Sequence, residues 1–515
     1  MQRYNLLTEP LIGVGYESGK KESLTLPGVL AKLSRDDIES FTALQPHQEQ
    51  AWYCFLVQLA AMAMHDCGAE TIEAEETEWA QRLRSLTKEY PADEPWCMVV
   101  EDLGKPGFMQ TPVPEGDLKG YAGWFEAPDE IDILIVAKAH DVKMLRIKTP
   151  ENENWIYALI NLQTLQGFLG RGNYGIVRMN GGFANRPFFG YSKSDTIGEE
   201  FRRDTEVLLR HHLALCEKFG YNGTDGVKLI WLRPWNGDEQ LLLTMLDPYF
   251  LEICRRVRFD VEMETGRLVC RTANTNGYRI NTTSINGITG DPWNVIRKDE
   301  GKSLSLSGNG FTYKLLREIL FEPGFNLPPC LEFQTGETGE WLLIANGFVR
   351  GQGVTEGLHR RVVPIPGRIR FMFNSPGGQE MLAKISKAML DDVRNFADKV
   401  FKMAICSLLQ PEREKFDFKD ARPQKWTRRL DSEIDRIYFE RLWNYSEGDQ
   451  EKNREDWIAE LRRLGEKLLI EAFDSIPIAA VRKYKTISSA EGRFNGGFYN
   501  AFPFMKKQTK GGEHA

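Results

Sequence analysis

The chain has 515 residues, a formal net charge of −7 and a pI near 5.8, with 42% hydrophobic and 27% charged residues. Its length favours two or more domains, and its acidic balance argues against a surface coated with basic residues for binding bare nucleic acid. No run approaches the roughly 20 apolar residues that cross a bilayer, and the first residues lack the pattern of a signal peptide. The eight cysteines form no C-x-x-C pair, which argues against a zinc ribbon and favours a reduced, cytoplasmic protein.

The N-terminal part mixes element types along the chain. Residues 48–66 are apolar nearly all round and predict a buried helix, and residues 155–166 predict another. Residues 225–246 hold two apolar runs around Arg-Pro-Trp-Asn-Gly, which predict strands joined by a turn. Connections rich in Gly, Asn and Pro dominate from 273 to 330. We therefore predict a large, irregular mixed α+β domain over residues 1–374.

The pattern becomes helical after residue 374. Apolar residues recur at spacings of three and four, with charged residues between them. Each helix is too polar on one face to be buried all round, so the helices are expected to pack against one another. We predict a four-helix bundle over residues 375–515, built from segments at 379–410, 422–446, 454–476 and, with a weaker pattern, 478–494.

One glycine motif matches two enzyme signatures. Gly170, Gly172, Gly175 and Val177 fit G-x-G-x-x-G-x-V, which occurs in protein kinases and, in shorter form, in dinucleotide-binding proteins. A dinucleotide loop must follow a strand and open a helix, whereas this motif follows a predicted helix and opens none. The V-A-I-K, H-R-D and D-F-G motifs of kinases are also missing. A nucleotide-dependent enzyme therefore stays only as an alternative interpretation.

Two His-Asp dipeptides raise a second enzymatic alternative. His65-Asp66 and His140-Asp141 resemble the paired metal ligands of one class of phosphohydrolases. His47 could be a further ligand, but no spacing makes the assignment specific, and His65 ends an apolar helix, where a capping or core role is common.

The glycine-rich loop at 167–175 has another interpretation. Glycines let a backbone approach another molecule closely and donate N–H groups to it. Arg171 and Arg178 add positive charge to this stretch. The loop is either a packing loop with unusual dihedral angles or a backbone wedge against a nucleic-acid groove.

Residues 350–370 contain five arginines and one glutamate. This pattern is often a solvated edge, but here Gln352 stands between Gly351 and Gly353, where an amide side chain can protrude into a narrow space. Flanking cations could neutralise phosphates: Arg350, Arg360 and Arg361. Two further basic clusters are Arg297-Lys298 with Lys302, and Lys138, Lys143, Arg146 and Lys148.

The order of four features resembles a known family. YNLLTEPLIGV begins at Tyr4, GFMQTP spans Gly107 to Pro112, the glycine loop follows at 167–175, and the Gly-Gln-Gly tip precedes LHRR. A helical C-terminal part completes the order. Over nearly the whole chain, this resembles the large subunits (CasA, Cse-type) of the type I-E CRISPR Cascade surveillance complex.

The resemblance implies a mixed N-terminal domain, a C-terminal four-helix bundle, and neither catalytic activity nor a cofactor. Family members lie beside the guide RNA 5′ handle and contact the handle-binding, backbone and small subunits. They recognise the protospacer-adjacent motif (PAM) of double-stranded DNA from the minor groove, start unwinding, and help recruit the helicase-nuclease. Minor-groove contacts give permissive readout, because the groove offers a degenerate code.

The resemblance also assigns site residues. The family's glycine loop corresponds to Gly170, Arg171, Gly172 and Asn173. Its lysine finger falls on Arg297 or Lys298, with Lys302 as a further register, and its glutamine wedge falls on Gln352. A loop around residues 140–152 would lie near the junction of guide and PAM and carries Lys143, Arg146 and Lys148.

One departure and one alternative accompany the resemblance. Some relatives carry a cysteine cluster that could hold zinc; this chain has only Cys254 and Cys270 in that region, so we expect no metal. A scaffold subunit that docks partners without reading DNA is the leading alternative function.

Overall fold

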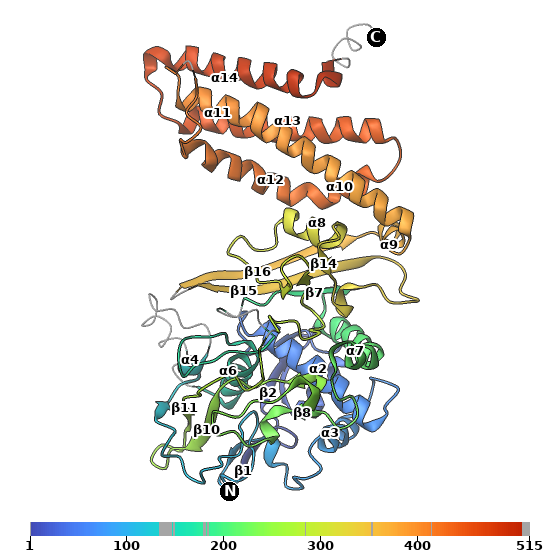
Figure 1. Cartoon of the computed structure of the whole chain (residues 1–515), viewed down its shortest axis with the longest axis vertical. Coiled ribbons are helices and arrows are strands. Elements are labelled where there is room, and N and C mark those ends of the chain that lie inside the picture. Colours follow the sequence, from blue (N-terminus) through green and yellow to red (C-terminus); the bar gives the residue numbers. More distant parts are fainter. Residues whose placement is uncertain are drawn as a thin grey trace. The chain divides into compact units, whose positions relative to one another are not determined.

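The computed structural model describes residues 2–132, 147, 150–178, 182, 185–283, 285–351, 354–413 and 415–506 (Figure 1). The predicted α+β class is confirmed. The chain divides into two compact units: Met1–Phe311 with Pro323–Ile365, and Thr312–Glu322 with Pro366–Ala515. These bounds differ from the ranges 1–374 and 375–515, because residues 312–322 and 366–374 belong to the second unit. No described helix is long and apolar enough to cross a membrane.

The described strands of the first unit form two- and three-stranded sheets. The neighbours are antiparallel except for β8 and β9, which are parallel. The sheets are β1 (Gln2–Asn5) with β5 (Cys97–Val100); β3 (Lys21–Leu24), β2 (Ile12–Gly15) and β4 (Ser40–Phe41); β10 (Arg256–Val261), β11 (Leu268–Ala273) and β6 (Gly123–Phe125); β13 (Lys302–Ser303), β12 (Ile296–Arg297) and β14 (Phe325–Asn326); β16 (Val354–Ile365), β15 (Trp341–Gly351) and β7 (Phe188–Ser192); and β8 (Val227–Leu229) with β9 (Leu246–Leu251).

The core of the first unit surrounds α2, which is buried on nearly every side, as its sequence predicts. The single polar side chain Gln58 in its middle is satisfied, because its amide donates hydrogen bonds to the carbonyls of Tyr249 (3.1 Å) and Phe250 (3.2 Å) in β9. The helices of this unit are α1 (Leu26–Leu33), α2 (Glu49–Cys67), α3 (Glu76–Ser85), α4 (Pro128–Ile131), α6 (Asn152–Leu165) and α7 (Ile197–Phe219), with short turns η1 (Glu94–Trp96), η3 (Ile230–Leu232), η4 (Leu243–Met245) and η5 (Pro329–Leu331).

The prediction of a strand in the second apolar run of 225–246 is wrong. The run forms the 3₁₀ turn η4, and strand β9 begins only at Leu246. Leu242 and Met245 are 51% and 47% exposed, so the leucine-rich run does not supply the continuous buried side that a core strand requires.

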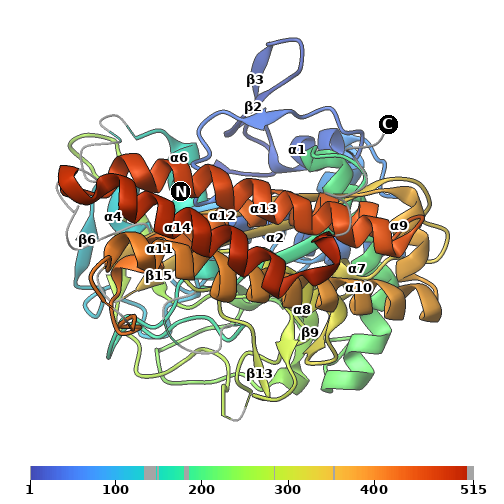
Figure 2. The same cartoon turned by 90° about the horizontal axis from the view of Figure 1, so that it is seen from above.

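The second unit contains the predicted long helical segments (Figures 1 and 2). Helices α10 and α11 are joined without a break by the π-helical turn η6, and α12, α13 and α14 pack against them. The elements are α8 (Tyr313–Phe321), α9 (Gly367–Phe373), α10 (Pro376–Phe396), η6 (Ala397–Phe401), α11 (Lys402–Leu409), α12 (Arg422–Tyr445), α13 (Gln450–Ser475), α14 (Ala480–Ala501) and η7 (Pro503–Lys506).

Helix α8 docks on this bundle through polar as well as apolar contacts. The Tyr313 hydroxyl donates to Asp431 of α12 (3.0 Å), and the Arg317 Nε–H donates to the Ser386 hydroxyl of α10 (3.0 Å). Arg317 and Ser386 are buried, so the pairing satisfies polar groups that would otherwise destabilise the interior.

Candidate nucleic-acid interface

The glycine loop makes a tight turn after α6. The Asn173 N–H donates to the Gly170 carbonyl (3.0 Å), and the Leu169 N–H donates to the Asn173 carbonyl (3.0 Å). Gly170 and Gly172 have φ angles of 111° and 89°, a region that side chains with a Cβ rarely adopt. Glycine is therefore needed at both positions for the turn itself.

The two arms of this loop, which lead into and out of its tip, both bond to the side chain of Arg255. Its buried guanidinium donates to the carbonyls of Gly167 (3.2 Å), Asn173 (3.4 Å) and Tyr174. The arms are so close that a Cβ on Gly175 would lie 2.4 Å from the Gly167 carbonyl carbon. These contacts make the loop a fixed projection rather than a pliable one.

The tip of the glycine loop exposes both apolar and polar side chains. Phe168 and Leu169 are 37% and 50% exposed, and the side chains of Arg171 and Asn173 are also exposed. Such a tip can contact sugars, phosphates and groove walls together. The expectation that Arg178 adds surface charge is wrong: its guanidinium is buried over the Phe250 ring, 4.2 Å from the centroid.

Strands β12 and β13 form a short hairpin that presents the predicted lysine-finger residues. Arg297 and Lys302 are register partners, and Glu300 forms ion pairs with both, at 3.7 Å for Arg297 Nε. The Lys298 side chain is exposed and has no ion pair with a described residue. The hairpin thus leaves Lys298 as the cation that is available to an incoming ligand.

The long hairpin of β15 and β16 carries the predicted wedge. Gly351 pairs with Val354, so the two strands are joined by positions 352 and 353; Gln352 and Gly353 lie outside the described residues. Arg350 does not face solvent: it is 6% exposed, and its guanidinium donates to the Gln166 side chain (2.7 Å). Burial and then the charge of Arg255 lower the pKa of Arg350 to about 10.

Two of the predicted DNA-binding elements are brought together by buried contacts. Gln166, the partner of Arg350, immediately precedes the glycine loop, and its carbonyl accepts a bond from the Ile176 N–H (2.9 Å). Asn185 also exchanges hydrogen bonds with the Arg350 backbone at 2.8 and 3.0 Å. The base of the hairpin tip and the base of the glycine loop are therefore one rigid assembly.

The third predicted element, the β12–β13 hairpin, is connected to the same assembly by the residues that follow it in the chain. The Leu306 N–H donates to the Asn185 carbonyl (2.9 Å). Because an extended chain spans at most about 3.6 Å per residue, Lys302 lies within roughly 14 Å of Leu306. The three predicted elements thus belong to one region of the first unit.

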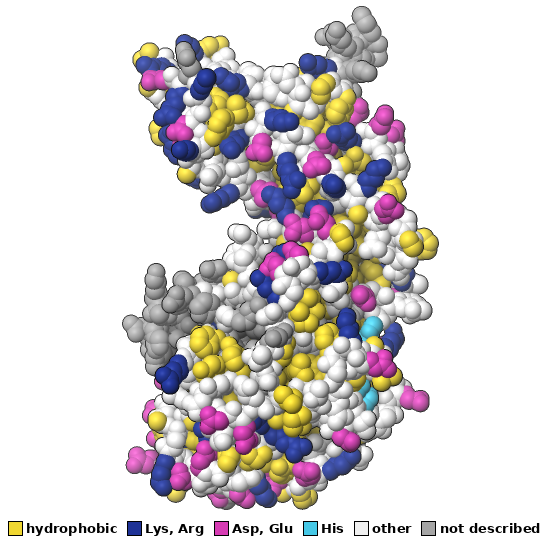
Figure 3. All heavy atoms as spheres, in the orientation of Figure 1, with side chains coloured by type: hydrophobic (Ala, Val, Ile, Leu, Met, Phe, Trp, Pro, Cys, Tyr) yellow, Lys and Arg dark blue, Asp and Glu magenta, His cyan; other side chains and the backbone are white. Residues whose placement is uncertain are grey.

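The described remaining cations, Arg360 and Arg361, already have partners within the protein. Arg360 forms an ion pair with Asp195, and the Arg361 guanidinium donates to the Phe311 carbonyl (2.8 Å). Lys143, Arg146 and Lys148 lie outside the described residues. On the face in Figure 3, basic and acidic side chains are interspersed, so the described side chains of this face form no broad basic patch.

Known proteins match this chain by structure. No protein-family model and no curated protein matches it. The crystal structure of the CRISPR-associated protein Cse1 from Acidimicrobium ferrooxidans is 14% identical, with a TM-score of 0.65 over 97% of this chain and 98% of that chain. CasA (Cse1) from Thermus thermophilus is 15% identical, with a TM-score of 0.60 over 97% and 100%.

A chain of a CRISPR RNA-guided surveillance complex is 11% identical, with a TM-score of 0.59 over 97% of this chain and 100% of that chain. These matches include both units. The chain has the Cse1 fold. The resemblance that the order of sequence features suggests is confirmed at this level. Within the Cse1 fold of this chain, buried arginine side chains fix the glycine loop and the base of the β15–β16 hairpin in place.

His65 and Asp66 do not form a metal site with other described residues, and His140 and Asp141 lie outside the described residues. Asp66 forms ion pairs with Lys88 (3.5 Å) and Lys228 (3.2 Å), and the His65 ring stacks on His212 with centroids 3.8 Å apart. The described part of the chain contains no group of three or more His, Cys, Asp or Glu that could hold a metal ion. Burial raises the pKa of the Cys254 thiol to about 11, which disfavours the thiolate that binds zinc.

Sequence reasoning missed the side chains that organise this region of the Cse1 fold. No sequence pattern points to Arg255 or Asn185, because their hydrogen-bond partners are carbonyls and amides far away in the sequence. Asp132 accepts hydrogen bonds from Gln48 (2.7 Å) and Asn161 (2.9 Å) and lies 2.9 Å from His47 Nε2. It fixes the chain immediately before the basic segment that contains Lys143.

Proposed function

We propose that this protein is the non-catalytic large subunit of a type I-E Cascade. In this role it recognises the PAM of double-stranded DNA from the minor groove, starts strand separation for guide pairing, and helps recruit the helicase-nuclease. Its other partners are the guide RNA 5′ handle and the handle-binding, backbone and small subunits. The Cse1 fold over nearly the whole chain supports the assignment to the complex.

The observation that carries the DNA-sensing part is the buried link between the two projections. Arg350 bonds to Gln166 (2.7 Å), so the backbone of the glycine loop and the strand end at Arg350, two residues before Gln352, are held at a fixed separation. Unstacking a base step costs about a few kcal/mol. A wedge that does this must be held firmly enough not to be displaced by the DNA. Freed bases are then paired by the guide, which offsets this cost.

The test of the function compares guide-loaded Cascade with and without this subunit on targets that differ only in the PAM. We expect PAM-dependent duplex binding in gel shifts only with the subunit. Gln352→Ala should retain binding but reduce strand opening, measured by 2-aminopurine fluorescence next to the PAM. Equal binding and opening without the subunit would leave the scaffold role instead.

A second prediction fixes the lysine-finger register. Lys298→Ala should weaken PAM-target binding by about tenfold, since a single specific contact contributes roughly 1–3 kcal/mol. Lys302→Ala is the matched control and should have a smaller effect, because Glu300 already pairs with Lys302. The dissociation constants are measured at one salt concentration. A larger loss for Lys302→Ala would place the finger at Lys302.

A further inference from the structure

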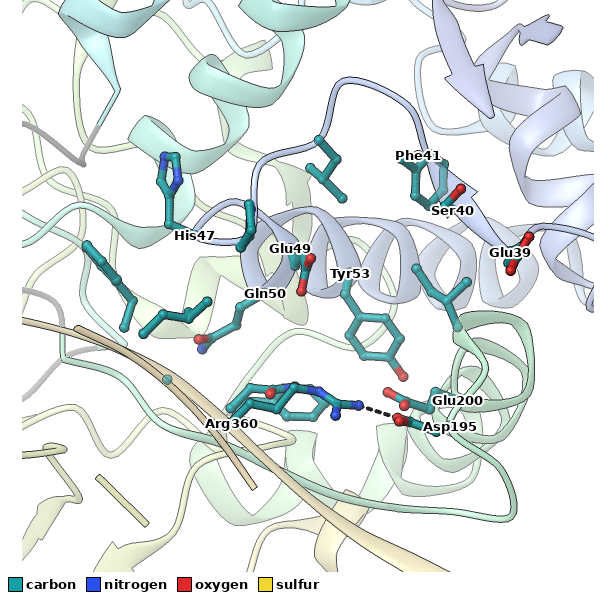
Figure 4. A pocket seen from close by; sticks show the side chains of 18 residues that line it. Glu39, Ser40, Phe41, His47, Glu49, Gln50, Tyr53, Asp195, Glu200 and Arg360 are labelled. Carbon is teal, nitrogen blue, oxygen red and sulfur yellow. Dashed lines mark hydrogen bonds and ion pairs between the residues drawn. The ribbon is translucent and has the colours of Figure 1, made fainter. Parts of the chain in front are cut away.

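The first unit contains a cavity of about 280 Å³ away from the glycine loop (Figure 4). Its walls come from the start of α2, the start of α7 and the β15–β16 hairpin. Aromatic and aliphatic side chains form much of the lining: Phe41, Tyr53, Phe188, Phe348 and Leu358. The cavity is slightly smaller than the roughly 300–1,000 Å³ sites of drug-sized ligands, so it suits a ligand of side-chain size.

More acidic than basic side chains line this cavity. Four carboxylates line it, from Glu39, Glu49, Asp195 and Glu200, and the one Lys or Arg among the described lining residues is Arg360. Figure 4 shows Arg360 reaching toward Asp195, with which it forms an ion pair. The cavity therefore has a surplus of carboxyl groups beside apolar walls.

Glu49 and Glu200 supply this surplus. Neither side-chain carboxylate makes a hydrogen bond or an ion pair with another described residue, and both side chains point toward the cavity in Figure 4. The nearby polar groups have other partners, because the Tyr53 hydroxyl donates to Asp204 (3.0 Å) and His47 lies against Asp132. The two carboxylates thus have unused acceptor oxygens beside aromatic rings.

The ionisation of Glu200 and Glu49 would respond to a bound cation. Burial, followed by the charges of Asp204 and Asp195, raises the pKa of Glu200 to about 8. Burial also raises the pKa of Glu49, against the opposing charges of Arg360 and His47. A cation placed between them would lower both pKa values and so release protons.

We propose that this cavity binds an organic cation: an alkylammonium or alkylguanidinium group on an apolar stem. The carboxylates pair with the charged head, as Asp195 already does with the Arg360 guanidinium, and the aromatic walls contact the stem and favour a cation over a ring face. The apolar walls suit this ligand better than a metal ion, which prefers to be surrounded by oxygen ligands. The source is either a free polyamine or a Lys or Arg side chain of a protein partner.

The test is calorimetric titration of the full chain at physiological salt with two probes, spermidine and N-acetyl-arginine amide. We expect binding of at least one probe, with a heat that depends on the buffer because Glu200 releases a proton. Glu200→Gln and Glu49→Gln should each weaken it about tenfold, the cost of losing one charged hydrogen bond of about 1.5 kcal/mol. Binding of spermidine alone indicates a free polyamine; binding of the arginine probe alone indicates a partner's side chain.

Two further variants separate this site from general attraction to an acidic protein. Arg360→Gln should strengthen binding, because it removes the guanidinium that competes for Asp195. Glu206→Gln, on the exposed face of α7 where Glu206 pairs with Arg210 (3.2 Å), should change nothing. The proposal is overturned if neither probe binds, if Glu206→Gln weakens binding as much as Glu200→Gln, or if Arg360→Gln weakens it.

Discussion

Gly175→Val is expected to abolish PAM-dependent binding while the rest of the protein stays folded. The new Cβ would lie 2.4 Å from the Gly167 carbonyl carbon and 2.7 Å from the Phe168 nitrogen. These are backbone atoms, which cannot rotate away, so the two arms of the glycine loop must separate. Their separation breaks the bonds from Arg255 to the carbonyls of both arms, and the tip loses its fixed shape.

The expected loss of target binding is large because the loop depends on the buried side chain of Arg255. Overpacking a tight site costs about 1–3 kcal/mol, and each lost hydrogen bond of a charged donor adds roughly 1.5–3 kcal/mol. The loop cannot keep its present conformation against these costs, and we expect target binding to fall by at least about a hundredfold in gel shifts, the equivalent of two interactions of 1.4 kcal/mol each.

The control for this prediction is Gly120→Val. Gly120 has no atom within 4 Å of the position of an added Cβ, so the same substitution there should leave binding unchanged. Far-UV circular dichroism and assembly into the guide-loaded complex report whether each variant is folded. Native PAM-dependent binding by folded Gly175→Val would show that DNA recognition does not use the shape of this loop.

Asp291→Ala is expected to lower the free energy of unfolding by about 3–5 kcal/mol, because it leaves a buried arginine without its partner. Arg186 Nε and Nη2 lie 2.5 and 2.7 Å from the two Asp291 carboxylate oxygens, and both side chains are buried. Burial alone would raise the pKa of Asp291, but the Arg186 guanidinium holds it below its usual value.

Urea unfolding followed by tryptophan fluorescence measures this loss. Glu206→Ala removes an exposed ion pair in the same unit and should cost less than about 1 kcal/mol. Adding Arg186→Met to Asp291→Ala should restore part of the stability, since the unpaired charge is removed as well. A loss below 1 kcal/mol for Asp291→Ala would mean that water reaches Arg186 and replaces the carboxylate.

The sequence predicts best where local periodicity decides the structure. The buried helix α2 and the long helices of the second unit follow from apolar spacing alone, and the glycine loop is visible as a loop. The spacing of apolar residues does not show which elements pack against one another. The pattern of α8 is amphipathic, with Leu316, Ile319 and Leu320 buried, yet nothing in it indicates that it packs on helices that begin more than fifty residues later.

Arginines are the clearest failure of reasoning from composition. Arg178 and Arg350 count as surface charge in the sequence, but their guanidinium groups are buried and bonded to carbonyls and to Gln166. Whether an arginine binds phosphate or braces a loop depends on acceptors brought close only by the tertiary fold. The same holds for the lysine finger, because the pairing of Glu300 with its two neighbours arises from the β12–β13 hairpin.

The position of α8 in the chain has a consequence during synthesis. The helix leaves the ribosome well before its packing partners α10 and α12. At about 5–20 residues per second, α12 is complete roughly 6 to 25 s after α8. Throughout this interval the apolar face of α8 lacks its packing partners, and the last strands of the first unit are still being added. Translation speed between residues 322 and 445 therefore sets how long this apolar face waits for its packing partners.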